Sequence, residues 1–297
     1  MVKIDTIRAS NAPFANQHHE GLVCVFAGAT SGIGLATCQK MTTMLQSSTF
    51  YILGRSPERY TDLLDQMREL APSNKIVYVE TQVSLIASID AACAQISSAE
   101  QKVDYLCMSP GGMPFQGAVC TLRLLSNLLP LLNRASQPRV LSILNGTREK
   151  KINEDDIGLE KAWGITAVVG HSTLLTSLAF DHLAAHDSQK HIVFIHSRTT
   201  YPSKKDGYFW WAFISVMQIV SGWMIRNFGM AAKESGERFA FLLISDTLSP
   251  GSWRTTRLSD TVPENNILKE YHERGWGEKI WDFTIGVWEE ALIKGTA

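Results

Sequence analysis

The sequence predicts an α/β fold in which a seven-stranded parallel sheet is covered by helices on both faces, a three-layer sandwich. Apolar runs of strand length alternate with segments of helical periodicity. The connecting segments are long enough for the crossover helices that parallel strands require. The predicted strands are residues 22–28, 49–54, 75–80, 103–108, 139–144, 191–196 and 239–245.

Three helices stand out between and after these runs. Leucines at helical spacing predict a helix over 117–134, and a second helix is expected over 160–186. Residues 277–294 form an amphipathic pattern with Trp281, Trp288 and Leu292 on one stripe. We expect one domain over 1–297, with an N-terminal extension (1–20), an apolar segment (203–233) and a helical tail (264–297).

Composition narrows the class of protein further. Hydrophobic residues make up 45% of the 297 residues and charged residues 19%, so the chain can bury a core and is not disordered. A net charge of −1 gives no electrostatic reason to expect a nucleic acid partner. The five cysteines lack CxxC or Cys/His metal spacing, which predicts reduced packing residues and no metal site. No signal peptide or transmembrane segment is recognisable, so a cytoplasmic location is expected.

A glycine-rich turn directly follows the first predicted strand. It reads Gly28-Ala29-Thr30-Ser31-Gly32-Ile33-Gly34 and opens a helical segment. The first glycine permits the tight turn, the second lets the backbone approach a pyrophosphate, and the third lets helix and strand pack closely. Free N–H groups at the helix N-terminus would then face the phosphates. This strand–turn–helix context predicts a Rossmann-type dinucleotide-binding domain.

The second predicted strand ends in Leu53-Gly54-Arg55-Ser56, where an NAD-binding domain usually carries an acid for the ribose 2′-hydroxyl. Arg55 can pair with a 2′-phosphate instead, and Ser56 can donate to it. NADP(H) is therefore the expected cofactor. The alternative is that Arg55 is a solvated loop residue.

The chain resembles the short-chain dehydrogenase/reductase family. The phosphate loop, Gly54-Arg55-Ser56, the Asp104-Tyr-Leu of the fourth strand and LTSLAFDHLA (175–184) fall in the family's order. ESGERFAFLL (234–243) resembles divergent members from fungal secondary metabolism. The resemblance implies a nicotinamide enzyme, commonly a homodimer or homotetramer, with its substrate above the carboxyl ends of the strands. The cofactor contacts it implies are Gly28, Thr30, Ser31, Gly32, Ile33, Gly34, Arg55, Ser56, Gln82, Val83, Ser109, Pro110 and Gly111.

The residues that reduce a carbonyl in that family are absent. The family uses a Tyr as acid, a Lys four residues later that lowers the Tyr pKa, and a Ser that polarises the carbonyl. Aligned on 175–179, the Tyr position falls on Gly164 or Trp163 and the Lys position on Val168 or Ala167. The Ser falls on or near Asn145. These departures put the family's activity in doubt, though not its fold.

Other residues could take part in the remaining chemistry. Tyr201 and Lys205 have YxxxK spacing, but they follow the sixth strand and are separated by Pro202, so the family role is disfavoured. His171 could share a helix face with Trp163 and Ala167 and point toward the nicotinamide, or it could be a packing histidine. The candidate catalytic residues are Asn145, Trp163, His171, Tyr201 and Ser109, with His196 and the cations Arg148, Lys150 and Lys151 as more distant possibilities.

The segment between the sixth and seventh predicted strands is unusually rich in aromatic residues. We expect a lid over a lipophilic substrate such as a terpenoid or polyketide. An oligomer interface and attachment to a membrane surface are the alternatives. The predicted lid residues are Trp210, Trp211, Phe213, Met217 and Trp223.

Three functions follow from these features. The first is a tailoring enzyme that retains NADP(H) as a structural or electrostatic element and performs a redox-neutral isomerisation, cyclisation or elimination. The second is hydride transfer to an activated carbonyl, enone or iminium, with the proton supplied by water, His171 or Tyr201. The third is a non-catalytic NADP(H)-sensing pseudoenzyme.

Overall fold

A computed structural model of the chain describes residues 2–19, 21–110, 114–198 and 232–294. These residues form one sheet in the order β3-β2-β1-β4-β5-β6-β7-β8, in which β1–β7 are parallel and β8 is antiparallel to β7. The strands are β1 (Val23–Ala27), β2 (Thr49–Gly54), β3 (Lys75–Glu80), β4 (Tyr105–Met108), β5 (Arg139–Leu144), β6 (Val193–Arg198), β7 (Gly251–Thr255) and β8 (Thr261–Val262).

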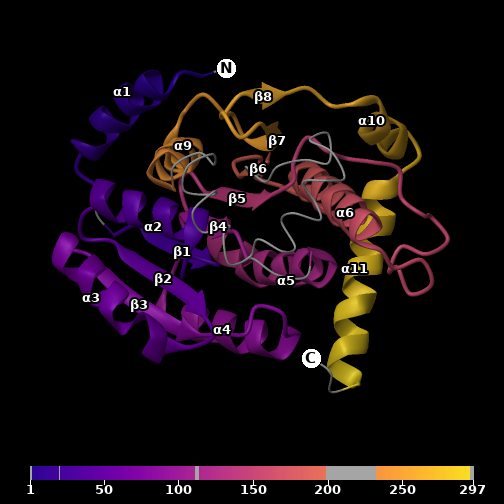
Figure 1. Ribbon diagram of the computed structural model, residues 1–297, viewed down its shortest axis with the longest axis horizontal. Coiled ribbons are helices and arrows are strands. Elements are labelled where there is room, and N and C mark those ends of the chain that lie inside the picture. Colours follow the sequence, from indigo (N-terminus) through magenta and orange to yellow (C-terminus); the bar gives the residue numbers. More distant parts are fainter. Residues whose placement is uncertain (1, 20, 111–113, 199–231, 295–297) are drawn as a thin grey trace, which may run out of the picture.

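Helices cover both faces of the sheet, which confirms the predicted three-layer sandwich (Figure 1). One layer holds α1 (Ile4–Ala15), α2 (Gly32–Met44), α3 (Thr61–Leu70) and α9 (Ala232–Ile244). The other holds α4 (Ile86–Ala99), α5 (Pro114–Leu132), α6 (Ile165–His186), α10 (Asn266–Glu273) and α11 (Trp276–Ile293). A short 3₁₀ helix, Pro57–Tyr60, precedes α3.

The strands supply side chains to both helical layers by strict alternation. In β1, Val23 and Val25 belong to the core under α4–α6, whereas Cys24 and Phe26 belong to the core under α2 and α9. Successive side chains of a strand point to opposite faces, so a strand with a helix layer on each side is apolar throughout. This explains why the first six strands were visible in the sequence as continuous apolar runs.

The seventh predicted strand, residues 239–245, is wrong. Its residues 239–244 form the second half of α9, and the seventh parallel strand is β7, Gly251–Thr255. Every residue of α9 from Ser235 to Ile244 is buried, since the helix packs against α2 and α1. A helix buried all round has no polar stripe, and its apolar run is therefore indistinguishable from that of a buried strand.

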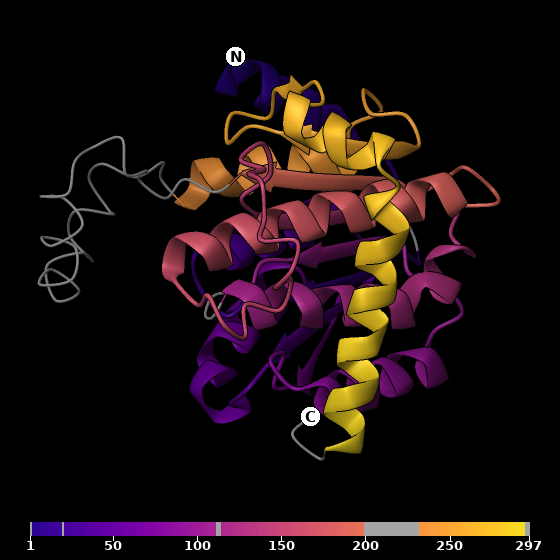
Figure 2. The ribbon, with the colours of Figure 1, turned by 90° about the vertical axis from the view of Figure 1, so that its right-hand side faces the viewer.

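The C-terminal helix α11 runs across the outer faces of α4, α5 and α6, as the side view shows (Figure 2). Trp276, Ile280, Thr284 and Trp288 are its buried residues, and the Trp288 indole N–H donates to the Val119 carbonyl at 3.0 Å. The helical tail expected from the sequence is thus part of the second helical layer.

Part of the expected N-terminal extension is helical. Ile7 of α1 is fully buried, and the Asn11 side chain donates to the Glu237 carboxylate of α9 at 2.8 Å. All five cysteines are buried and unbridged. Within the described residues, no helix is both long enough and apolar enough to cross a bilayer.

Candidate functional site

The turn between β1 and α2 is held against the residue that follows β4. Gly28 has φ +83°, and a Cβ on it would lie 2.5 Å from the Ser109 carbonyl oxygen. Ser109 donates its N–H to the Ala27 carbonyl at 2.9 Å and its hydroxyl to the Gly28 carbonyl at 3.3 Å. A Cβ on Gly34 would lie 2.1 Å from the Ser109 hydroxyl oxygen and 2.5 Å from the Gly28 carbonyl oxygen. Two of the three glycines are therefore required by packing.

Gly32 is different, because nothing lies within 4 Å of the place where its Cβ would be. It has φ +61°, is exposed and begins α2, and its neighbour Ser31 is also exposed. The first turn of α2 carries no acidic side chain. An open backbone surface at a positively polarised helix N-terminus fits the pyrophosphate of a dinucleotide. Thr30, Ser31, Gly32 and Ile33 would line it.

The end of β2 lies beside this loop. A Cβ on Gly54 would meet the Thr30 methyl carbon at 2.8 Å and the Tyr78 hydroxyl at 2.3 Å, so the next residue, Arg55, emerges next to the phosphate loop. Arg55 is exposed, and no described carboxylate pairs with its guanidinium. The Ser56 N–H donates to the Tyr78 hydroxyl at 3.3 Å. Among the described residues, Arg55 is thus an unpaired cation beside the glycine turn.

The remaining predicted cofactor residues lie at the same edge of the sheet. Gln82 and Val83 follow β3, and the Gln82 side chain donates to the Ser84 hydroxyl at 3.3 Å. Ser109 and Pro110 follow β4 and are half-buried. Gly111 lies outside the described residues.

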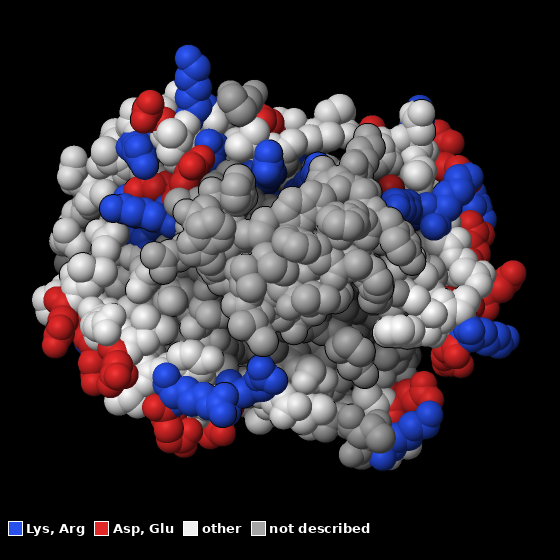
Figure 3. Space-filling model, in the orientation of Figure 1, with Lys and Arg blue, Asp and Glu red and all other residues white. Residues whose placement is uncertain are grey.

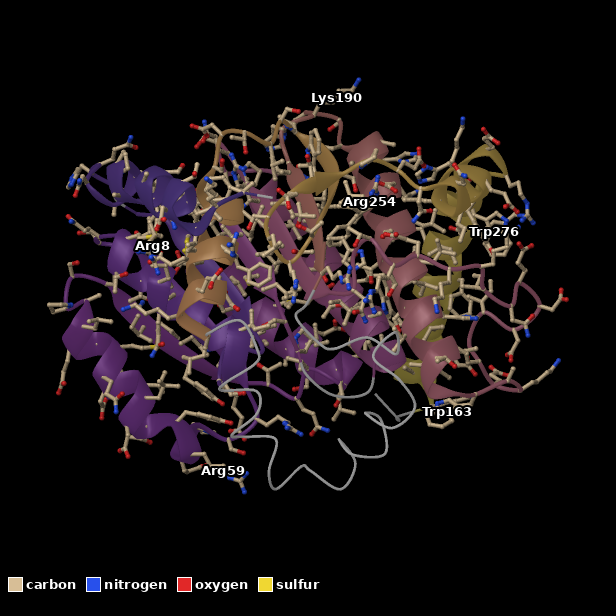
Figure 4. The ribbon with its side chains drawn as sticks, turned by 45° about the horizontal axis from the view of Figure 1, so that its top comes forward. Arg8, Arg59, Trp163, Lys190, Arg254 and Trp276 are labelled. Carbon is tan, nitrogen blue, oxygen red and sulfur yellow. The ribbon has the colours of Figure 1, made fainter. Side chains whose placement is uncertain are left out.

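The residues that the sequence resemblance aligns with the family's Tyr and Lys lie just before α6 and in its first turn. Helix α6 begins at Ile165, so Gly164 is its N-cap and Trp163 precedes it, while Val168 is buried. Trp163 is 64% exposed and projects at the edge where the strands end, opposite Lys190 at the other edge (Figure 4). The prediction that Trp163 shares a helix face with Ala167 and His171 is wrong, since the helix starts two residues later.

His171 is buried and has both ring nitrogens bonded to the β5–α6 loop, residues 145–164. Its Nε2 accepts the Asn153 N–H at 3.1 Å, and its Nδ1 donates to the Ile157 carbonyl at 3.0 Å. Burial lowers its pKa, although the Ile157 hydrogen bond and the Asp156 carboxylate oppose this. The His171 imidazole therefore stabilises the β5–α6 loop through both of its ring nitrogens. These contacts do not support the expectation that His171 delivers a proton to a substrate.

Asn145 directly follows β5 and forms an isolated β-bridge with Arg198 at the end of β6. Its carbonyl accepts the Arg148 N–H at 3.2 Å, which closes a turn. Asn145 and Ser109 therefore lie at the carboxyl edge of the sheet, as expected. Tyr201 and the predicted lid residues Trp210, Trp211, Phe213, Met217 and Trp223 lie outside the described residues.

Sequence reasoning missed a buried polar network beneath the β5–α6 loop. The Glu149 carboxylate is buried and accepts the Ser177 hydroxyl at 2.7 Å and the Asn265 amide at 2.8 Å. The Ser177 hydroxyl also contacts His196 Nδ1 at 2.9 Å. Burial, followed by the Arg254 charge, lowers the pKa of His196 to about 3, against the opposing effect of Asp181. Glu149 sits in the charged run 148–151, whose pattern is typical of a solvated loop, so the sequence carried no signal for its burial.

Taken together, the parallel sheet, the β1–α2 glycine turn and the free Arg55 define a dinucleotide-binding α/β enzyme. Residues 22–122 match the family profile for short chain dehydrogenase. Over these residues the chain is therefore similar to the short-chain dehydrogenase/reductase family.

Similar proteins span nearly the whole chain. Oxidoreductase AN1596 of Emericella nidulans is 29% identical, with 98% of this chain and 99% of that protein aligned. Oxidoreductase lepF of Aspergillus flavus is 28% identical, with 100% and 99% aligned. The crystal structure of L-sorbose reductase from Gluconobacter frateurii, complexed with NADPH and L-sorbose, has a TM-score of 0.55 at 17% identity, covering 79% of this chain and 94% of that one.

Proposed function

We propose that this protein is an NADP(H)-dependent oxidoreductase that acts on a lipophilic small molecule. The observation that carries the proposal is the β1–α2 turn, whose Gly32 faces open space beside the unpaired Arg55. Proteins that align over nearly its full length are named oxidoreductases. Hydride transfer is the chemistry that a bound NADP(H) supplies.

The proton for such a reaction has another origin than in the family's usual enzymes. The sequence alignment puts Gly164 or Trp163 at the Tyr position and Val168 or Ala167 at the Lys position, and both nitrogens of His171 are engaged by backbone groups. Activated acceptors such as an enone or an iminium need little acid assistance, since water can protonate the product afterwards. We therefore propose a substrate of this activated kind.

A redox-neutral reaction is the second candidate. An isomerisation, cyclisation or elimination would use NADP(H) as part of the scaffold and needs no hydride acceptor. What supports it is the sequence alignment, in which no acid stands at residues 163–164 and no cation at residues 167–168.

The lipophilic character of the substrate is inferred from the aromatic segment 203–233, whose predicted lid residues are outside the described part of the chain. The relatives come from Emericella and Aspergillus. A terpenoid or polyketide from fungal secondary metabolism fits both facts.

We further propose that the enzyme is cytoplasmic and forms a homodimer or homotetramer. Light scattering of the purified protein tests the oligomeric state.

The test is turnover with NADPH and an extract of lipophilic metabolites, in which NADPH absorbance and product mass are followed together. The matched control is Gly32→Asp, which puts a carboxylate where the pyrophosphate would bind. NADPH loss in proportion to a product two hydrogens heavier supports hydride transfer. A product of unchanged mass without NADPH loss contradicts it and supports the redox-neutral candidate. Tight NADPH binding with no turnover on any fraction would indicate a cofactor-sensing protein.

A further inference from the structure

Three neighbouring strands end at the same edge of the sheet, and an arginine lies at or just beyond each end. Arg198 is the last residue of β6 and pairs in register with Leu144 of β5. Arg148 lies in the turn after β5. Its backbone N–H donates to the Asn145 carbonyl and closes this turn. Arg257 lies in the turn after β7, where the Thr256 N–H donates to the Asp260 carbonyl at 2.8 Å. We call Arg148, Arg198 and Arg257 the arginine cluster.

The members of the cluster are close enough to influence one another. Burial lowers the pKa of Arg198, and the charges of Arg148 and Arg257 lower it further. Arg198 and Arg148 are half-buried, and Arg257 is exposed. Three like charges at one place raise the free energy of the folded protein unless an anion neutralises them.

Two other cations of the same region, Arg254 and Lys151, have carboxylate partners. Arg254 of β7 forms two hydrogen bonds with Asp181 at 2.7 and 2.8 Å, and Lys151 lies 2.8 Å from Glu270. In contrast, none of the ion pairs within the described residues includes a member of the arginine cluster. On the face shown in Figure 3, visible Lys and Arg side chains lie among Asp and Glu side chains. The cluster is thus a local excess of positive charge on a protein whose net charge is −1.

The arginine cluster lies away from the expected cofactor phosphates, on the half of the carboxyl edge where a substrate would bind. The phosphate loop follows β1, and Arg55 follows β2, on the other side of β4 from β5, β6 and β7. Ligands of open parallel sheets bind along the carboxyl edge, and the half beyond the phosphate loop is left for the reacting molecule. The cluster lies on that half, next to Asn145.

We propose that the arginine cluster binds a carboxylate group of the substrate, so that the lipophilic molecule is an acid. The inference rests on the proposed function only in assuming that a substrate occupies this edge. A guanidinium matches a carboxylate with two parallel hydrogen bonds, and a half-buried one binds it more strongly than an exposed lysine does. Binding there would fix which end of the molecule faces the cofactor.

The test compares a fluorescent fatty acid, cis-parinaric acid, with its methyl ester, titrated onto the full chain with and without NADP⁺. One charge-assisted contact corresponds to an affinity change of about tenfold or more, so the acid should bind at least about tenfold tighter than the ester. Arg198→Met and Arg148→Met should abolish this preference. Lys150→Met, which removes an exposed cation two residues beyond Arg148, should preserve it. Equal affinity for acid and ester, absence of acid binding, or an equal effect of Lys150→Met overturns the proposal.

Two further measurements separate binding from a structural or cofactor role. Arg198→Met should leave the melting temperature of the free protein unchanged or raise it, because it relieves repulsion. Arg254→Met should lower it, because it removes both hydrogen bonds that Arg254 makes with the half-buried Asp181 carboxylate. NADPH affinity should be unchanged in the cluster variants. A lowered melting temperature in Arg198→Met, or a parallel loss of NADPH affinity, contradicts the inference. Because parinaric acid binding is measured without turnover, the proposed oxidoreductase activity can fail while the acid preference remains, and the reverse.

Discussion

At the scale of single residues, the glycines of one loop are required for opposite reasons. Gly34 has no room for a side chain, because its Cβ would collide with Ser109 and with the Gly28 carbonyl. Gly32 has ample room, but its φ is +61° and its open side is where a pyrophosphate would bind. Glycine is thus required by close packing at position 34 and by an open binding surface at position 32.

This difference predicts different effects on stability. Gly34→Ala should destabilise the protein by about 1–3 kcal/mol, the usual cost of overpacking, because the Gly28 carbonyl is backbone and cannot swing aside. Gly32→Asn should cost less than about 1 kcal/mol, since Asn tolerates a positive φ and meets no atom. Both should lose NADPH affinity. Thermal melts and NADPH titrations of the two variants check this; equal melting temperatures would refute the distinction.

Arg55 carries the prediction about cofactor choice. Arg55→Glu should weaken NADPH binding by about 10- to 100-fold, the effect of losing a charge-assisted pair, and should leave NADH binding equal or improved. Arg59→Glu is the matched control, because it changes the same charge four residues further on, in the 3₁₀ helix before α3. Parallel weakening of NADPH and NADH by Arg55→Glu would instead point to a structural role.

These residues could be predicted because their signal is local. The glycine turn and Arg55 are recognisable within a few residues of a strand end. The roles of His171 and Glu149 were hidden, since their partners are distant in sequence: Asn153 lies 18 residues from His171, and Asn265 lies 116 residues from Glu149. Such contacts exist only after α6 and α10 have packed.

At the scale of elements, the main error of sequence reasoning was the exchange of a helix for a strand. A Cβ on Gly236 would lie 2.5 Å from the Ala36 carbonyl of α2, so α9 and α2 approach at backbone distance. The true seventh strand, Gly-Ser-Trp-Arg-Thr, is mostly half-buried and carries no apolar run. The apolar pattern of a sequence indicates which segments are buried, and α9 is more deeply buried than β7.

The β5–α6 loop is the element whose stability His171 should control. His171→Leu leaves the Asn153 N–H and the Ile157 carbonyl without partners, which should cost about 1–3 kcal/mol. Amide exchange in residues 145–164 should accelerate while NADPH affinity stays unchanged. The control is His186→Leu at the far end of α6, an exposed histidine that bonds only within its own helix. Unchanged exchange in the loop of the His171 variant would show that other contacts suffice.

At the scale of the whole molecule, the polar groups between α6, β6 and β7 connect the second helical layer to the sheet. Asp181 of α6 pairs with Arg254 of β7, which is labelled in Figure 4, and with His272 of α10. Ser177 of α6 contacts His196 of β6. His196 is fully buried, and its Nε2 has no hydrogen-bond partner among the described residues. The folded protein therefore holds this imidazole neutral.

The stability of the protein should fall as the pH drops below about 6.5, the pKa of an unfolded histidine, because the unfolded chain can protonate His196 and the folded one cannot until about pH 3. A depressed pKa gives stability that is complete above the unfolded value and declines by up to about 1.4 kcal/mol per pH unit below it. His171, whose pKa is also lowered, adds to this slope. His272, whose pKa is raised by Asp181, acts in the opposite direction: its contribution to stability is fully present below the unfolded pKa and is lost as the pH rises.

Carboxylates whose pKa is lowered in the folded protein lose their contribution to stability below about pH 5, so the interval from about pH 5.5 to 6.5 isolates the histidines. Urea unfolding across that interval gives the slope of the unfolding free energy against pH. In His196→Asn this slope should correspond to about one proton fewer than in the wild type, even if the variant is less stable at pH 7. The exposed His186→Asn should keep the wild-type slope. If His196→Asn also keeps the wild-type slope, the His196 ring is protonated in the folded protein, and the inference that it is neutral is wrong.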